Sequence, residues 1–271
     1  YLFDKHPYKM SVIGEMEHLD AATLDEFQAF NKKYYVPNNA VLVVAGDIEI
    51  DSTKRMIEAY FGPIPRGADI NRTITKDAPI TETIKATEYD ANIQIPALVL
   101  CYRTPSMKDR ESYVLQMIST YLSDGKSSKL YKSLVDDSKK ALQVFAFNRG
   151  MEDYSVYNII AMPLGKVTLD DLKKDIDAEI LKIQSDLISE RDYQKLQNIF
   201  ENNFVNSNSS VEGIANSLAR NYMLYGDISL INRGIDIYRS ITREEIRSVA
   251  QKYLNANQRL ELEYLPESDQ D

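Results

Sequence analysis

Apolar residues recur at helical spacing through much of the chain, and this periodicity predicts where the helices lie. The longest periodic run extends from Leu169 to Leu187 at intervals of 3 and 4 residues, which places its apolar side chains on one helix face. The same criterion predicts further helices at about 23–35, 56–61, 114–124, 128–135, 193–200, 214–225 and 229–238, and a last one starting at Thr242. Helices therefore dominate the chain after Thr168.

Apolar, β-branched stretches predict strands between these helices. They lie at residues 40–44, 93–103, 141–147, 154–162 and 260–264. Pro96 favours an edge position, a bulge or the start of its strand. The third and fourth stretches could pair across the turn at Asn148-Arg149-Gly150. Strands followed by helices predict an α+β fold, with an antiparallel or mixed sheet and helices packed on one face.

Two helix starts carry the same capping signature. Thr23 and Glu26 stand in the Ser/Thr-x-x-Glu relation of a capping box, and so do Thr242 and Glu245. In such a box the side chains at both ends hold backbone N–H groups of the first helical turn. Both helices are therefore predicted to begin directly after their threonine.

The end of the chain repeats its beginning at a constant offset. Thr242 lies 219 positions after Thr23, and Asn257 lies 219 positions after Asn38. An apolar, β-rich stretch follows each copy. Because a fixed-period match indicates duplicated structural units, we expect one whole unit preceded by only the tail of another, so that the chain begins inside a domain.

A stretch without apolar periodicity separates the two expected units. Residues 62–90 contain Pro63, Pro65 and Gly67, several threonines and scattered charges, a composition typical of a linker. We therefore expect residues 1–68 to be the C-terminal part of a first domain, 69–90 to be a linker and 91–271 to be a complete second domain.

Composition excludes several classes of function. The 271 residues are 44% hydrophobic, which supports a real core. The formal net charge of −9 lacks the basic footprint of a nucleic-acid-binding protein. No apolar run is long enough to span a membrane. The single cysteine, Cys101, excludes an internal disulfide and, within an apolar run, is interpreted as a buried strand residue rather than a nucleophile.

The chain contains two histidines, His6 and His18, as candidates for metal binding or acid–base chemistry. Glu15 and Glu17 lie close to His18, but no second histidine stands three or four residues from it, as a helical metal site needs. Pro7 favours an extended backbone at His6. Metal binding by this pair is therefore the minor hypothesis, and a structural or surface role is the main one.

Other candidate motifs favour ordinary structural roles. Gly125-Lys126-Ser127 resembles the end of a phosphate-binding loop, but the earlier glycine and the preceding strand are missing, so a turn is predicted. Asp136-Asp137 and Asp170-Asp171 are adjacent pairs, predicted to be solvated. The second pair falls in the first turn of a helix, where negative charge complements the dipole. Neither histidine lies in a motif around a nucleophile, which disfavours Ser/His/Asp catalysis.

The order and spacing of several segments together resemble a known family. These are His6-Pro7-Tyr8, Ile13-Gly14, Tyr34-Tyr35, Pro37-Asn38-Asn39, Leu42 to Asp47, Tyr60 to Pro65, and Leu122 to Tyr131. They are similar to segments of the insulinase/pitrilysin-type zinc metallopeptidases, in particular the mitochondrial-processing-peptidase-like branch. The resemblance extends over essentially the whole chain, with residues 6–65 similar to the closing part of a catalytic domain.

The resemblance implies a tandem architecture and a zinc reaction. Two similar α+β units joined by a linker enclose a chamber for extended or unfolded peptides. An inverted His-x-x-Glu-His helix and a distal Glu hold the zinc and activate its bound water. None of these residues is present here, and they are expected upstream of Tyr1.

The chain also departs from the family at a substrate grip. Many active relatives carry an Arg, and seven residues later a Tyr, where this chain has Val135 and Leu142. This half is therefore expected to lack that polar grip. Lys126 and Lys129 are interpreted as solvated lysines of an exposed turn.

The leading hypothesis is a portion of a zinc-dependent metalloendopeptidase that acts on peptides or unfolded proteins, with this chain supplying the noncatalytic half of the chamber. We expect no catalytic, cofactor-binding or metal-binding residue in this chain, and zinc only in the whole protein. A catalytic-type domain, in cis or in a second subunit, is the expected partner. The alternative is a catalytically inactive scaffold or partner subunit of the same family.

Overall fold

The computed structural model describes residues 1–269, which form two compact units. The first unit contains residues 1–4, 77–202 and the chain from residue 235 onward. The second contains residues 5–76 and 203–234.

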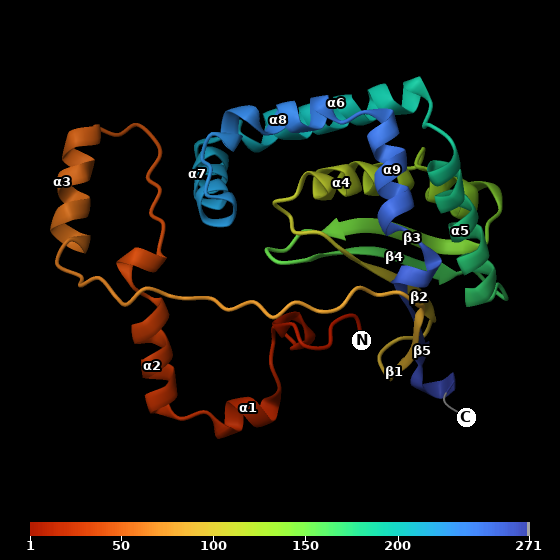
Figure 1. The fold of residues 1–271 in the computed structure, drawn as a ribbon, viewed down its shortest axis with the longest axis horizontal. Coiled ribbons are helices and arrows are strands. Elements are labelled where there is room, and N and C mark those ends of the chain that lie inside the picture. Colours follow the sequence, from red (N-terminus) through yellow and green to blue (C-terminus); the bar gives the residue numbers. More distant parts are fainter. Residues whose placement is uncertain (270–271) are drawn as a thin grey trace. The chain divides into compact units, whose positions relative to one another are not determined.

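The first unit is built on one mixed sheet (Figure 1). Its strands are β1 (Ile84–Asp90), β2 (Ala97–Thr104), β3 (Ala141–Arg149), β4 (Ser155–Pro163) and β5 (Arg259–Pro266). Within the described residues the sheet has five strands in the order β1-β5-β2-β4-β3. β1 runs parallel to β5, and the other neighbours are antiparallel. The predicted pairing of β3 with β4 is confirmed, and Pro96 precedes the first residue of β2.

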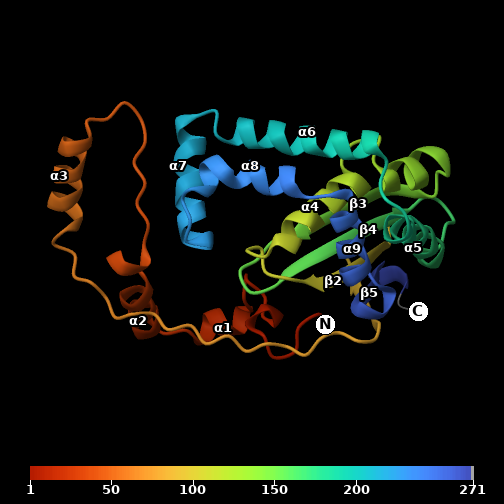
Figure 2. The ribbon, with the colours of Figure 1, turned by 45° about the horizontal axis from the view of Figure 1, so that its top comes forward.

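Helices cover one face of this sheet (Figures 1 and 2). They are α4 (Arg110–Ser123), α5 (Leu169–Ser185) and α9 (Arg243–Tyr253), with the π-helix η3 (Tyr131–Asp137) after α4. The 3-10 turns η5 (Ala256–Gln258) and η6 (Glu267–Asp269) flank β5. α6 (Glu190–Ser207) and α8 (Leu230–Ser240) each have residues in both units. The predicted α+β class, with helices on one face of a mixed sheet, is confirmed.

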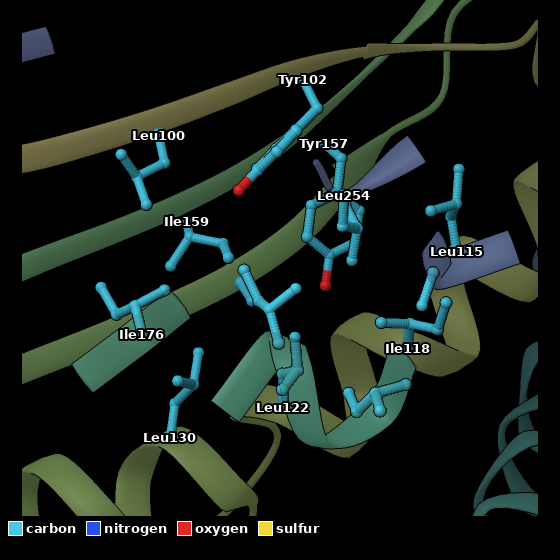
Figure 3. Close-up of a cluster of buried hydrophobic side chains, with 14 of the residues drawn as sticks. Leu100, Tyr102, Leu115, Ile118, Leu122, Leu130, Tyr157, Ile159, Ile176 and Leu254 are labelled. Atoms are coloured by element: carbon cyan, nitrogen blue, oxygen red, sulfur yellow. The ribbon is translucent and has the colours of Figure 1, made fainter. Parts of the chain in front are cut away.

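The core lies between the sheet and α4, α5 and α9. Its labelled members in Figure 3 are Leu100, Tyr102, Leu115, Ile118, Leu122, Leu130, Tyr157, Ile159, Ile176 and Leu254. Ile118 and Leu122 of α4 and Ile176 of α5 have 0% of their surface exposed. Burying each such side chain contributes about 1.5–3 kcal/mol, so the periodic positions of the sequence are the ones that stabilise this unit.

The capping motifs start their helices as predicted, with one exception. Thr23 and Glu26 form the predicted reciprocal box at α2 (Leu24–Tyr34). Thr168 and Asp171 form a further, unpredicted box at α5. At α9 the hydroxyl of Thr242 accepts from the backbone of Glu245 at 3.1 Å. The carboxylate of Glu245 instead accepts from Arg110 at 2.6 and 2.9 Å. The second capping box is therefore only half formed, because a cation on α4 competes for the carboxylate.

The second unit contains only helices and irregular backbone in its described residues. The helices of this unit are η1 (Pro7–Lys9), α1 (Met16–Ala21), α2, η2 (Pro37–Asn39), α3 (Ile50–Phe61), α7 (Val211–Arg220), the π-helix η4 (Asn221–Tyr225) and the adjoining ends of α6 and α8. Many of its apolar side chains are exposed, including Phe27, Phe30 and Phe61 at 51–59%.

The sequence repeat is also a repeat of local structure. α2 and α9 both follow a threonine cap, and η2 and η5 occupy positions that keep the offset of the sequence match. After η5 the chain forms β5, between β1 and β2. After η2, residues 40–44 stay outside any strand.

The strand predicted at residues 40–44 is therefore wrong for this structure. A strand needs a neighbour for its backbone N–H and C=O groups, and the described residues of the second unit contain no strand to pair with. Val41, Leu42 and Val44 are instead exposed at 39%, 54% and 43%.

The segment 69–90 was expected as a linker, but it ends in β1. Residues 65–81 are irregular, and the strand begins at Ile84. β1 was missed because Lys85, Thr87 and Glu88 are exposed on an edge strand, which leaves no apolar alternation to detect.

Candidate functional site

The sheet face opposite the helices carries partly exposed apolar side chains. The register places Val99 and Cys101 of β2 beside Ile160 and Asn158 of β4, and Phe145 and Phe147 of β3 beside those. Phe145 and Phe147 are exposed at 46% and 43%. This uncovered face therefore offers apolar side chains on a regular backbone.

Cys101 belongs to this face and is not a candidate nucleophile. Its thiol donates to Oδ1 of Asn158 at 3.2 Å. Burial raises the pKa of the Cys101 thiol to about 11, which keeps it protonated near neutral pH. The interpretation as a strand residue is supported.

Arg103 clamps two extended segments against one end of the uncovered face. Its guanidinium donates to the carbonyl oxygens of Ala78 at 2.7 Å and Leu2 at 2.8 Å. The guanidinium carbon lies 5.2 Å from the ring centre of Phe3 and 5.7 Å from that of Tyr154. The clamp holds residues 1–4 on the sheet unit, and a cavity of about 400 Å³ lies beside it.

A second cavity, of about 360 Å³, lies beside β1 on the helix side of the sheet. It is lined by Lys85, Ala86, Thr87, Leu98, Leu169, Asp170, Lys173, Glu261 and Glu263. Lys173 bonds Asp170 at 2.7 Å and Glu261 at 3.3 Å. Three of the lining side chains are carboxylates and two are ammonium groups, so the cavity wall is on balance acidic.

A buried ionic network ties β5 to α5. Arg259, with 2% of its side chain exposed, donates to Asp177 at 2.9 Å, to Glu261 at 2.7 Å and to the Tyr102 hydroxyl at 3.0 Å. Burial raises the pKa of Tyr102 to about 12. Burial also opposes the charge on Glu261, but Arg259 and Lys173 outweigh it and lower the pKa of Glu261. The network fixes the strand that carries Glu261 and Glu263.

Val135 and Leu142, at the positions of the expected substrate grip, lie near the start of β3. Val135 is half-buried in η3 and packs against the core. Leu142 is 43% exposed and falls where the β3–β4 register shifts between Ala141 and Gln143. Neither side chain can donate a hydrogen bond to a peptide backbone.

The turn at Gly125 is confirmed as a turn that follows a helix rather than a strand. Gly125 has φ of +73°, and the Ser128 hydroxyl donates to its carbonyl oxygen at 2.7 Å. Lys126 is exposed. The interpretation of Lys129 as solvated is wrong, because its ammonium binds Asp192 at 2.9 Å and lies 5.1 Å from the Tyr121 ring centre.

The acidic pairs take the places predicted for them. Asp136 and Asp137 are exposed. Asp171 caps its own helix, and Asp170 bonds Lys173. All four carboxylates therefore have surface or capping roles.

The histidines lie in different local settings. His6 is 1% exposed, and its Nδ1 accepts from the backbone N–H of Tyr8 at 3.1 Å. His18 is exposed on α1. Across residues 1–269, no three His, Cys, Asp or Glu side chains gather in a way that could hold a metal ion. The residues present therefore do not fit a zinc site.

Comparison with known proteins identifies the family. Residues 21–200 match the family model described as the Peptidase M16 inactive domain. This match spans well over half of the chain. The chain belongs to the M16 inactive-domain family.

Relatives of this M16 chain are named zinc proteases. It is 27% identical over 225 residues to the zinc protease PqqE of Helicobacter pylori, covering 82% of this chain and 50% of the relative. It is 22% identical over 256 residues to an uncharacterized zinc protease of Mycobacterium leprae, covering 94% and 57%. The chain thus spans about half the length of these curated relatives.

Solved structures share the fold. A protease from Helicobacter pylori superposes with a TM-score of 0.86 at 23% identity, covering 96% of this chain and 63% of that one. A peptidase M16 inactive domain from Pseudomonas fluorescens gives 0.83 at 16% identity, covering 98% and 62%. A chain in a structure of complex III2 from Candida albicans gives 0.76 at 12% identity, covering 94% and 62%.

In the part of the chain that the structure describes, no helix combines the length and apolar character that a bilayer crossing requires.

Proposed function

We propose that this chain supplies the noncatalytic half of a zinc-dependent endopeptidase, where it helps to enclose extended or unfolded peptides. The observation that carries the proposal is the match of residues 21–200 to the M16 inactive domain. The uncovered sheet face, with Phe145 and Phe147 exposed, provides a surface for such a role. In such an enzyme zinc activates water for peptide hydrolysis, and the zinc ligands would belong to the rest of the protein.

The domain division follows from the repeat. Residues 1–68 would be the trailing part of a catalytic-type domain and 69–83 the linker, with β1 joining residues 91–271 as the second domain. A solved inactive peptidase domain from Bordetella parapertussis, 92% of which is covered by 63% of this chain at a TM-score of 0.57, is an example of a domain of about this length. Residues 40–44 would then pair in the first domain as residues 259–263 pair in β5.

The alternative function is a catalytically inactive scaffold or partner subunit. Two observations favour keeping it: Val135 and Leu142 replace the polar grip expected of active relatives, and the same fold occurs in a complex III2 structure. In that case the whole protein would hold no catalytic zinc and would contribute only surfaces for assembly.

The deciding experiment uses the full-length protein encoded by the gene. Its zinc content and its hydrolysis of an unfolded polypeptide are measured beside a version that lacks residues 91–271. The proposal predicts about one zinc per chain and hydrolysis that is strongly reduced by the deletion, with zinc retained. A full-length protein without zinc and without hydrolysis would establish the scaffold alternative instead.

A further inference from the structure

Arg103 brings an uncompensated positive charge to one end of the sheet. Its two terminal nitrogens donate to neutral carbonyl oxygens, that of Ala78 at 2.7 Å and that of Leu2 at 2.8 Å. Its Nε is buried without a hydrogen-bond partner, and within residues 1–269 the guanidinium makes no ion pair. Because taking a charge out of water is costly unless an opposite charge lies beside it, this guanidinium favours a bound anion.

The cavity beside Arg103 has the make-up of a pocket for a small ligand. Its volume of about 400 Å³ lies within the roughly 300–1,000 Å³ of such pockets. Pro79, Ile80 and Pro105 give it apolar walls, and the ring of Tyr154 adds an aromatic one. A ligand that fits should therefore combine an anionic group with an apolar group.

The other charged groups of the lining already have partners. The Lys252 ammonium bonds Glu111 at 2.6 Å, so these two charges offset each other. The Asp77 carboxylate accepts a backbone N–H at 3.1 Å. Gln258 accepts with its Oε1 from Asn255 at 3.1 Å, whereas its Nε2 donates to no group in the part of the chain that the structure describes. The lining therefore offers an anion one uncompensated cation and one free amide donor.

This cavity lies at the opposite end of the sheet from Leu142, one of the two positions of the expected substrate grip. Thr104 lines the cavity and pairs with Ser155, at the start of β4. The residue next to Leu142, Ala141, pairs with Pro163 at the end of β4. The length of β4 therefore separates the cavity from the grip position, and a ligand in the cavity needs contacts of its own.

We propose that this cavity binds a carboxylate attached to an apolar group, the chemistry shared by the C-terminal residue of a peptide and a free N-acyl amino acid. The carboxylate lies beside Arg103 and Gln258. The apolar side chain packs on Pro79 and Ile80. A single negative charge matches the one uncompensated cation, and Asp77 in the wall disfavours a doubly charged phosphate. The inference goes beyond the proposed function, because the site requires neither zinc nor hydrolysis.

The test measures binding to the 271-residue chain by fluorescence anisotropy. The probe is a short peptide of glycine and serine with a fluorophore at its N-terminus and a C-terminal leucine that has a free carboxylate. One twin carries a C-terminal amide instead, and a second twin ends in serine. We expect each twin to bind about tenfold or more weakly, because the first loses a charged hydrogen-bond acceptor and the second loses the burial of leucine.

A competitor identifies the source of the carboxylate. Unlabelled N-acetyl-leucine has the carboxylate and the apolar side chain but no peptide chain. Displacement of the probe by N-acetyl-leucine as readily as by unlabelled peptide would assign the site to small free carboxylates. Displacement by the peptide alone would assign it to a peptide C-terminus.

Variants locate the site. Gln258→Glu keeps the size of the side chain and the oxygen that accepts from Asn255, but it replaces the free donor by a negative charge and should weaken binding of the probe about tenfold. Gln143→Glu is the matched control on an exposed position of β3 and should leave binding unchanged. Arg103→Gln should abolish binding, and Arg103→Lys, which keeps the charge, should retain part of it. Circular dichroism checks that each variant is folded.

Several results would overturn the inference. Equal binding of the free-acid peptide and its amide twin would show that no carboxylate is recognised, and so would the absence of binding by all three peptides. Unchanged binding in a folded Gln258→Glu variant would place the ligand outside this cavity. None of these results bears on zinc binding or hydrolysis by the full-length protein, so this inference and the proposed function can fail separately.

Discussion

Arg259 and Asp177 form a two-point ion pair that fastens the last strand of the chain to α5. The guanidinium is almost fully buried, whereas the Asp177 side chain is 38% exposed. The same guanidinium also reaches Glu261 and the Tyr102 hydroxyl. One side chain therefore joins β5, β2 and α5.

Replacing this arginine should destabilise the sheet unit. Arg259→Met removes the cation and leaves Glu261 and Asp177 without it. We expect a loss of about 3 kcal/mol, the lower end of the range for breaking a buried pair, because Asp177 is partly solvated. Arg259→Lys keeps the charge but loses the planar fork, so its loss should be smaller. Urea unfolding followed by circular dichroism measures both. Equal stability of Arg259→Met and the wild type would show that the network contributes nothing.

The same network predicts a stability loss in acid. Burial works against the Glu261 carboxylate, but Arg259 and Lys173 lower its pKa in the folded state. A carboxylate with a lowered folded pKa contributes stability above its unfolded pKa, near the ordinary value of 4.5, and loses it as the pH falls through the folded pKa. Urea midpoints measured from pH 7 downward should therefore drop below about pH 4.5. The drop should be shallower in Arg259→Met, and an unchanged slope in that variant would contradict this assignment.

The Ser123 hydroxyl, which bonds the backbone of Ala146 in the edge strand β3, should contribute measurably to the stability of the sheet unit. Ser123→Ala removes both hydrogen bonds to Ala146, a residue only 7% exposed. The expected cost is about 1–3 kcal/mol, the desolvation penalty of backbone groups left unpaired. Ser138→Ala is the matched control, because the Ser138 hydroxyl makes only a 3.5 Å contact to Leu134. A control as damaging as Ser123→Ala would contradict a specific role for the edge contact.

The paired threonine caps offer a test of the repeat. Thr242→Ala should cost about 1 kcal/mol and shift the cooperative unfolding of the sheet unit, because α9 packs into the core. Thr23→Ala removes an equivalent cap from α2, whose residues are exposed or half-buried. It should reduce helix content locally and leave the sheet unit's unfolding midpoint in place. A shift of that midpoint by Thr23→Ala would show that the two copies are energetically coupled in this chain.

The sequence predicted the elements whose signals are local. Leu169 to Ile183 predict the buried face of α5, whereas the cap at Thr168 is identified only in the structure. The β3–β4 pair could be predicted because both strands contain long apolar stretches joined by a short turn. Local chemistry dominates in each case, so no distant partner was needed to define them.

The features that the sequence does not predict correctly depend on distant partners. Residues 40–44 have the composition of a strand, yet they remain unpaired because a strand exists only beside another. Lys85 and Glu88 hide β1, which its ladder to β5 defines. Arg259 and Glu261 look like the solvated positions of an alternating strand. Only the bonds of Arg259 to Asp177 of α5 and to Glu261 reveal a buried network. No single segment of the sequence predicts the cavity beside β1, because its lining comes from β1, β2, α5 and β5.

The most direct test of the central claim is the zinc content of the purified 271-residue chain after exposure to zinc and gel filtration. A noncatalytic half should retain no stoichiometric zinc and should not hydrolyse an unfolded polypeptide. The full-length protein should retain zinc and should hydrolyse that polypeptide. About one tightly held zinc per chain, lost on mutation of His6 or His18, would contradict the assignment of this chain to the noncatalytic half.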